Sequence, residues 1–227
     1  MVRIRYSHAL LGGVAVVAAA CATTEAVKTA PPPVAETPPP APPEPEPSVF
    51  SDTMSVCPGM TVANRPATDA DLVIAPFSPF VTVDGKVTLA VAPVADGCFS
   101  SGFGPRSFSN HKGIDYYSSA PVDVYAAGGG TVKEKTYRDD FGNMLVIDHG
   151  NGVFTRYAHL DSFAPGLAEG QKVAAGKVIG VMGNTASYKI PRHLHYEMLT
   201  GEWGAQAKSF ALTPIDPMKQ AAAKAGS

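Results

Sequence analysis

The stretch Asn143–Leu160, NMLVIDHGNGVFTRYAHL, decides the fold. Two runs rich in β-branched and aromatic residues flank Asn151-Gly152, the dipeptide that most strongly favours a short hairpin turn. We therefore expect two adjacent antiparallel strands here. Similar β-rich runs, separated by turn residues, lie at 130–137, 177–183 and 193–199. From Gly97 onward no long stretch has helical spacing, so we predict a mainly β domain, an antiparallel sheet or sandwich.

The first twenty residues have the layout of an export signal. Arg3 and Arg5 precede the apolar run Ala9–Ala20, which is too short to span a bilayer comfortably, so we predict a cleaved signal peptide at 1–20 and not an uncleaved anchor. The run ends in AAAC, which resembles the lipobox of bacterial lipoproteins and implies that Cys21 is lipidated. The alternative is ordinary cleavage at this place, giving a soluble periplasmic product.

The next part of the chain is rich in proline. Ten of the twenty residues in Thr29–Ser48 are proline, so we predict that 21–48 is a Pro-rich disordered linker that acts as an extended spacer. A Pro-rich ligand for a partner domain is the alternative.

Without residues 1–20, the chain has 16 basic and 20 acidic residues, a formal net charge of about −4. No basic block remains, so nucleic-acid binding is not expected.

Two cysteines remain once Cys21 is assigned to lipid. In an exported chain such a pair is more often bonded than free, so we predict a Cys57–Cys98 disulfide, with two buried thiols as the alternative. The bond would tie residues 49–96, which we expect to be an irregular N-terminal extension with one or two strands, to the start of the next domain.

Four histidines fall in three short motifs: HKGID (111–115), RYAHL (156–160) and HLHYE (193–197). His193 and His195 alternate along a predicted strand, so they share one face, with Glu197 next in the row. Zinc binds imidazole nitrogens and carboxylate oxygens at about 2.0–2.2 Å, and a catalytic site keeps one position open for water. His111, Asp115 and one histidine of the pair would supply such a set.

From about Phe99 to Met198 the chain resembles the lysostaphin/LytM-type family of zinc peptidoglycan endopeptidases. SSGFGPR leads in, HKGID and the central strands follow, and GQKVAAGKVIGVMGNT precedes HLHYE. The resemblance implies that one zinc ion per chain is bound by His111, Asp115 and His195. It also implies that His159 and His193 are unliganded catalytic histidines. We accordingly predict a peptidase domain at 97–200 and a C-terminal tail at 201–227.

The sequence departs from the family pattern in two places. Arg192 stands where the family usually has proline, and YYSSAPVDVYAA lacks the usual Gly-Thr-Pro before VYAA. Both segments are expected beside the substrate groove, where they bear on specificity.

The chemistry implied is metal-assisted amide hydrolysis. No HExxH helix is present, so we expect His159 to act as the general base and His193 to stabilise the oxyanion or protonate the leaving amine, or the reverse. Glu197 either orients a histidine or is an exposed carboxylate. Tyr157 is expected on the same strand face as His159, lining the groove or packing. His149, beside the Asn-Gly turn, is expected to be structural.

These features predict a lipid-anchored periplasmic endopeptidase that cuts peptidoglycan cross-links in cell-wall remodelling. The lipoprotein leader and the Pro/Ala-rich stalk suggest a Gram-negative host, hence D-alanyl-to-diaminopimelate bonds, and Ala22 gives no inner-membrane retention signal, hence the outer membrane. The main alternative is a non-catalytic relative that binds wall peptides or activates a partner amidase. A lipoyl- or biotinyl-carrier-like sandwich is disfavoured by export and by the lack of a Lys-bearing hairpin.

Overall fold

The computed structural model describes residues 49–107 and 109–223. The predicted signal peptide, Cys21 and the Pro-rich linker lie outside these residues. Within the described part of the chain, no helix has the length and apolar character needed to cross a bilayer.

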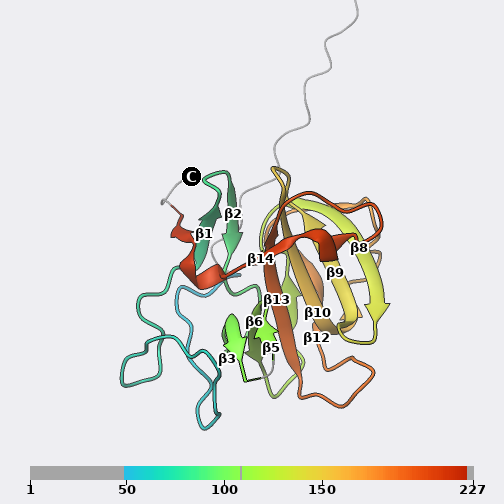
Figure 1. Cartoon of the computed structure of the whole chain (residues 1–227). Helices are drawn as coiled ribbons and strands as arrows, with labels where there is room; N and C mark the ends of the chain where they lie inside the picture. The colour runs from blue at the N-terminus through green and yellow to red at the C-terminus, as the bar shows by residue number, and fades with distance from the viewer. Residues whose placement is uncertain (1–48, 108, 224–227) are drawn as a thin grey trace, which may run out of the picture. The chain divides into compact units, whose positions relative to one another are not determined.

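Antiparallel strands are the main regular secondary structure of the described chain (Figure 1). The main sheet has the order β11-β8-β9-β10-β13-β6-β3, to which β12, β7 and β14 are attached. Its strands are β3 (Cys98–Ser101), β6 (Ile114–Tyr117), β7 (Asp123–Tyr125), β8 (Gly130–Arg138), β9 (Gly142–Asp148), β10 (Val153–Phe163), β11 (Lys172–Val173), β12 (Val178–Met182), β13 (His193–Thr200) and β14 (Thr213–Ile215). The prediction of a mainly antiparallel β fold is confirmed.

Smaller elements surround this sheet. They are the three-stranded sheet of β1 (Phe80–Val83), β2 (Val87–Ala90) and β15 (Ala221–Ala222), the pair β4 (Gly104–Arg106) and β5 (Ser109–His111), and the 3₁₀-helices η1 (Ser209–Ala211) and η2 (Pro217–Lys219). The C-terminal residues take part in both sheets, because β14 pairs with β13 and β15 pairs with β1.

The Asn-Gly turn joins β9 to β10 as the sequence predicts. Asn151 and Gly152 have φ values of 53° and 71°, and the Val153 N–H donates to the Gly150 carbonyl at 2.9 Å. Two successive positive φ angles are typical of the type I′ hairpin turn, and Asn and Gly adopt them with little strain.

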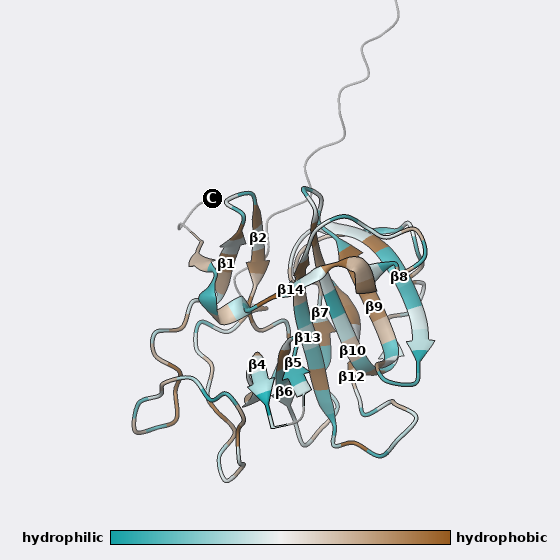
Figure 2. Cartoon of the chain, viewed as in Figure 1, coloured by the Kyte–Doolittle hydropathy of each residue, from teal (hydrophilic) through white to brown (hydrophobic). Residues whose placement is uncertain are grey.

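The two faces of the main sheet carry different residues. Leu194, Tyr196 and Met198 of β13 point into the main core with Ile114 and Tyr116 of β6. The alternate residues of β13 therefore face the other way, and Figure 2 shows hydrophilic and hydrophobic residues alternating along this strand. The opposite face holds a polar site at one end. At its other end lies a second apolar cluster, made by Met144, Val146, Phe154, Leu199 and Leu212.

The N-terminal extension is packed into the same core as the strands. Its residues Phe50, Met54, Val56 and Ile74 are buried in the main cluster together with Phe99 and Ile114. Short parallel bridges join Val56 to Phe99 and Ala63 to Ser101 along the outer edge of β3. The predicted Cys57–Cys98 disulfide is present, with an S–S distance of 2.00 Å.

Candidate metal centre

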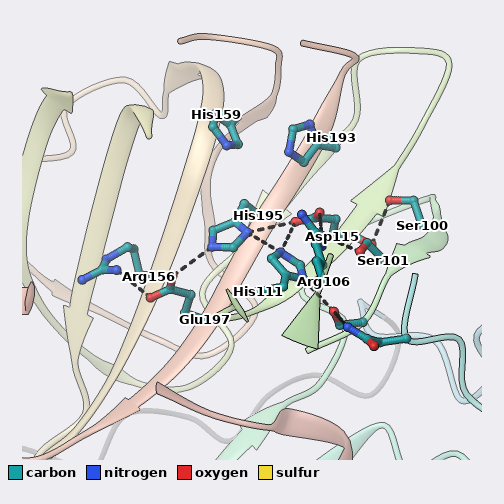
Figure 3. Close-up of polar contacts among 12 residues, drawn as sticks. Ser100, Ser101, Arg106, His111, Asp115, Arg156, His159, His193, His195 and Glu197 are labelled. Atoms are coloured by element: carbon teal, nitrogen blue, oxygen red, sulfur yellow. Dashed lines mark hydrogen bonds and ion pairs between the residues drawn. The ribbon is translucent and has the colours of Figure 1, made fainter. Parts of the chain in front are cut away.

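Three side chains from separate elements meet on the polar face of the sheet (Figure 3). Asp115 and His195 are paired residues of the neighbouring strands β6 and β13, and His111 ends β5. His111 Nε2 lies 3.0 Å from Asp115 Oδ1 and 3.0 Å from His195 Nδ1, and the last two atoms are 2.9 Å apart. The cross-strand register and the short loop after β5 therefore bring three potential ligands to one point.

A second contact fixes the tautomer of each of the two imidazoles. The Nδ1–H of His111 donates to the Gly102 carbonyl at 2.7 Å, and the Nε2–H of His195 donates to Glu197 Oε1 at 2.9 Å. In a neutral imidazole the other nitrogen then carries a lone pair. Both lone pairs point at the same place as Asp115 Oδ1, so three electron-rich atoms face one another and require a cation or a proton between them.

The donor set fits zinc. Three ligand atoms on a tetrahedral zinc ion, each at about 2.0–2.1 Å, are about 3.3 Å apart, close to the spacing found here. Among the described residues, His111, Asp115 and His195 form a group whose ligand atoms all lie within 4.8 Å of one another. Two imidazoles and one carboxylate, with no fourth protein ligand in that group, match the composition of a catalytic zinc site.

Charge at this point is stabilised by the surrounding groups. Burial alone would raise the pKa of Asp115, but its contacts with His111 and His195 hold that pKa well below its ordinary value. Burial would lower the pKa of His195, yet its hydrogen bonds to Asp115 and Glu197 raise it to about 9. The carboxylates therefore favour a positive charge between the donors, which a metal cation provides in place of a proton.

Glu197 is a buried partner of His195 and not an exposed carboxylate. Its side chain has no exposed surface, and its second oxygen accepts a 2.6 Å hydrogen bond from Arg156 Nη1. Arg156 Nη2 in turn donates to the carbonyl of Ser209 at 2.8 Å. The chain of contacts runs from His195 through this ion pair to the C-terminal segment, which resolves the two alternatives for Glu197 in favour of an orienting role.

Asp115 also has supporting contacts. Arg106 Nη2 lies 3.1 Å from Asp115 Oδ2 and also bonds Ser101, while the Ser100 hydroxyl donates to the Asp115 carbonyl at 3.0 Å. The sequence predicts SSGFGPR only as the lead-in to the domain and does not predict these contacts. A basic residue a few positions before the HKGID motif was the signal that could have suggested a partner for the aspartate.

His159 and His193 lie side by side above the donor group (Figure 3), with ring centroids 4.6 Å apart. The Nδ1–H of His159 donates to the Thr185 carbonyl and that of His193 to the Pro191 carbonyl, each at 2.9 Å. Burial lowers the pKa of His159 to about 4 and also lowers the pKa of His193. At neutral pH both rings are therefore neutral and each presents a basic Nε2.

The prediction that Tyr157 and His159 share a strand face is wrong. The register of β10 against β9 shifts between Tyr157 and Leu160, and His159 has a φ of 60°. Because of this bulge Tyr157 and Leu160, three residues apart, both point into the core. His159 is turned instead onto the polar face, and the Tyr157 hydroxyl accepts a core hydrogen bond from the Ala127 N–H at 2.8 Å.

His149 has a structural place, as expected. Its Nδ1–H donates to the Gly129 carbonyl and its Nε2 contacts Thr155 Oγ1, both at 2.8 Å. These contacts join the end of β9 to the segment before β8 and to β10.

The two departures from the family pattern touch each other. Arg192 Nη1 donates to the Ser119 carbonyl at 2.9 Å, which links the residue before His193 to the segment that follows β6. The unusual arginine and the unusual serine-containing segment thus form one contact next to the site.

The residues that form this site lie in a part of the chain that matches a known protein family. Residues 109–208 match the model described as Peptidase family M23. This range, 100 of the chain's 227 residues, is similar to M23 peptidases and is named the M23 domain here. The predicted metal ligands and catalytic histidines all fall within the M23 domain, whereas β3 and residues 49–107 precede it.

Relatives of the M23 domain have names that describe cell-wall enzymes. The chain is 38% identical over 107 residues to "Peptidoglycan DD-endopeptidase ShyA" of Vibrio cholerae, covering 44% of this chain and 24% of that protein. It is 38% identical over 125 residues to "DD-carboxypeptidase/endopeptidase Mpg" of Neisseria meningitidis, covering 50% and 28%. The chain thus spans about a quarter of the length of these relatives. A solved zinc-containing peptidase from Vibrio cholerae is 26% identical, with a TM-score of 0.49, covering 62% of this chain and 45% of that one.

Proposed function

We propose that this protein is a zinc-dependent endopeptidase that hydrolyses peptide cross-links of peptidoglycan. The observation that carries the proposal is the group of three ligand atoms 2.9–3.0 Å apart, with two neutral histidines directly beside it. A peptidase needs this combination because a metal activates the amide while a separate base handles protons. The names of the relatives support peptidoglycan as the substrate class.

The three ligands and the two free histidines have separate roles. His111, Asp115 and His195 would hold the zinc ion. The chemistry that zinc supplies when bound is Lewis acidity toward the scissile carbonyl and a lower pKa, near about 7, for the attacking water. These residues orient the ion, while His159 and His193 move protons.

The tautomers of the two free histidines define what each can do. Backbone carbonyls hold the Nδ1 protons of His159 and His193, so each ring accepts a proton at Nε2. His159 takes the proton of the attacking water and would pass it to the nitrogen of the leaving amine as the C–N bond breaks, while a proton from solvent on the second ring would let that ring stabilise the oxyanion. Because both rings have the same tautomer, the two roles are interchangeable in this geometry.

The finer parts of the proposal rest on names and on the leader sequence. D-alanyl-to-diaminopimelate cross-links are the proposed bonds, supported by relatives named DD-endopeptidases. The lipid anchor at Cys21 and a periplasmic, outer-membrane location are inferred from residues 1–22 alone. The complete donor set disfavours a purely non-catalytic role as an amidase activator.

Digestion of cross-linked muropeptides by the zinc-loaded protein tests the function. The wild type should convert dimers to monomers, and mass spectrometry of the products identifies the bond. A chelator or His195→Ala should stop the reaction, whereas Lys112→Ala, an exposed neighbour of the first ligand, should not. Intact cross-links after incubation with the zinc-loaded wild type would refute the proposal.

A further inference from the structure

One supporting contact of the metal centre comes from outside the M23 domain. The Gly102 carbonyl fixes the ring of His111 through its 2.7 Å hydrogen bond, yet residue 102 precedes the matched range 109–208. The ligand geometry of His111 therefore depends on where the segment after β3 lies.

The N-terminal extension holds this segment at a single point. The Gly102 N–H donates to the Ala63 carbonyl at 2.8 Å, and Asn64 Nδ2 reaches the Gly102 carbonyl at 3.4 Å. The two backbones touch, because a Cβ placed on Gly102 would lie 2.3 Å from the backbone oxygen of Asn64. Residue 102 must be glycine for the extension to approach this closely.

The disulfide anchors the extension next to this contact. Cys57 bonds Cys98 of β3, and around the disulfide the Cys57 N–H donates to the Phe99 carbonyl at 3.0 Å and the Phe99 N–H to the Ser55 carbonyl at 2.9 Å. Residues 58–61 and 63–65 are exposed. Among residues 58–65 only Val62 packs against the core, so the position of the exposed Ala63–Asn64 pair depends on that contact, on the backbone bonds and on the covalent link nearby.

The same edge of the sheet supports a second ligand. Ser101 of β3 is paired with Asp115 of β6, and Ser100 donates to the Asp115 carbonyl at 3.0 Å. Ser101 also contacts Arg106, whose guanidinium lies 3.1 Å from Asp115 Oδ2. A displacement of β3 would therefore reach two of the three donors.

We propose that residues 54–64, tied by the Cys57–Cys98 disulfide, are a positioning element of the metal centre. They hold residues 98–102 where the Gly102 carbonyl orients His111 and where Ser100 and Ser101 support Asp115. Zinc affinity should therefore fall when the disulfide is removed, although neither cysteine touches a ligand. This inference rests on the zinc site of the proposed function but not on peptide hydrolysis.

The first test removes the covalent link. Zinc affinity of the full chain is measured by competition with a chromogenic chelator, well below the melting temperature, for the wild type and for Cys57→Ala/Cys98→Ala. Losing contacts of this kind typically weakens metal binding by about 10- to 100-fold, and we expect a loss in that range. Val83→Ala in β1, a buried residue away from the site, is the control that lowers stability without changing affinity.

The second test leaves the disulfide intact and covers the case in which the cysteine variant does not fold. Gly102→Ala pushes the extension and residues 101–104 apart and should weaken zinc binding in the same range. In the ¹⁵N-labelled zinc-loaded wild type, the Nδ1 proton of His111 should exchange slowly. In the variant it should exchange fast, while the Nε2 proton of His195, held by Glu197, stays protected as an internal control.

The outcomes separate this inference from the proposed function. Wild-type zinc affinity and a protected His111 proton in both variants would overturn the positioning role, whatever the activity. Tight zinc binding by the wild type, weakened in both variants, supports the inference even if no cross-link is cut.

Discussion

At the scale of single residues, the site depends on groups that hold the ligands and not only on the ligands. Glu197 has two partners at once, His195 on one oxygen and Arg156 on the other. An uncharged amide in its place has one acceptor oxygen, so it can accept from His195 or from Arg156 but not from both, and it leaves the buried guanidinium without its charge partner. Function and stability should therefore both respond to this position.

We expect Glu197→Gln to weaken zinc binding by about 10- to 100-fold, the usual effect of losing a ligand's hydrogen-bond partner. It should also destabilise the fold by about 3–5 kcal/mol, the cost of removing one charge of a buried ion pair and leaving the other without its partner. Chelator competition and urea unfolding measure the two effects. Glu134→Gln is the matched control, because Glu134 contacts Ser209 and Lys208 but no histidine of the site. Equal zinc affinities in the two variants would contradict the orienting role.

His149 predicts a pH dependence of stability. Burial lowers its pKa from 6.5 to about 4 in the folded protein. Below pH 6.5 the unfolded chain binds a proton that the folded chain does not, so the free energy of unfolding falls as the pH is lowered toward about 4 and then levels off. The loss amounts to at most about 3 kcal/mol, at about 1.36 kcal/mol per pKa unit.

Denaturant unfolding of metal-free wild type and His149→Asn between pH 8 and pH 4 isolates this contribution. The variant should be less stable at pH 8, but the gap between the two curves should narrow as the pH falls. A constant gap would show that His149 titrates alike in both states.

At the scale of elements, the sequence predicts the strands of the sheet but not the bulge in β10. The strands are predictable because the Asn-Gly turn and the alternation of apolar residues both act over short range. The bulge is not, because one extra residue leaves composition unchanged while it reverses the face of every residue beyond it. The five candidate site residues are predicted by the resemblance of their motifs to a known family, whereas Arg106, Ser101 and Gly102 needed the cross-strand register of β3 and β6.

The left-handed backbone of His159 predicts a separation of stability from activity. A non-glycine residue at a φ of 60° is strained by about 1–3 kcal/mol, and asparagine adopts this region more readily than histidine because its short polar side chain can hydrogen-bond locally. We expect His159→Asn to melt at the same temperature as the wild type or higher. Hydrolysis should fall by about 10²–10⁴-fold, the range for loss of a general base. A clear drop in melting temperature would show that the ring also stabilises the fold.

At the scale of the described molecule, the extension and the strands share one core. The residues that bury the extension come from a part of the chain outside the M23 match, so composition alone does not reveal that they belong together. Their apolar runs are short and broken by prolines, and only the contacts in three dimensions show that Met54, Val56 and Ile74 pack with Phe99.

A shortened protein tests this shared core. A chain that begins at Gly97 loses Phe50, Met54, Val56 and Ile74, exposes their partners and leaves the outer edge of β3 unpaired. Such edges pair with other chains, so we expect aggregation and no cooperative melting. Size-exclusion chromatography and circular dichroism compare it with a chain that begins at Val49. A monomeric, cooperatively melting short form would show that the strands fold by themselves.

The bond between Arg192 and Ser119 ties together the two stretches that depart from the expected family pattern. Proline at 192 would remove the donor, and a different loop after β6 would place its backbone carbonyl elsewhere. Exchanging either loop alone should therefore produce a mismatched hybrid. Engineers who transplant substrate preference between such enzymes would need to move both loops as one cassette.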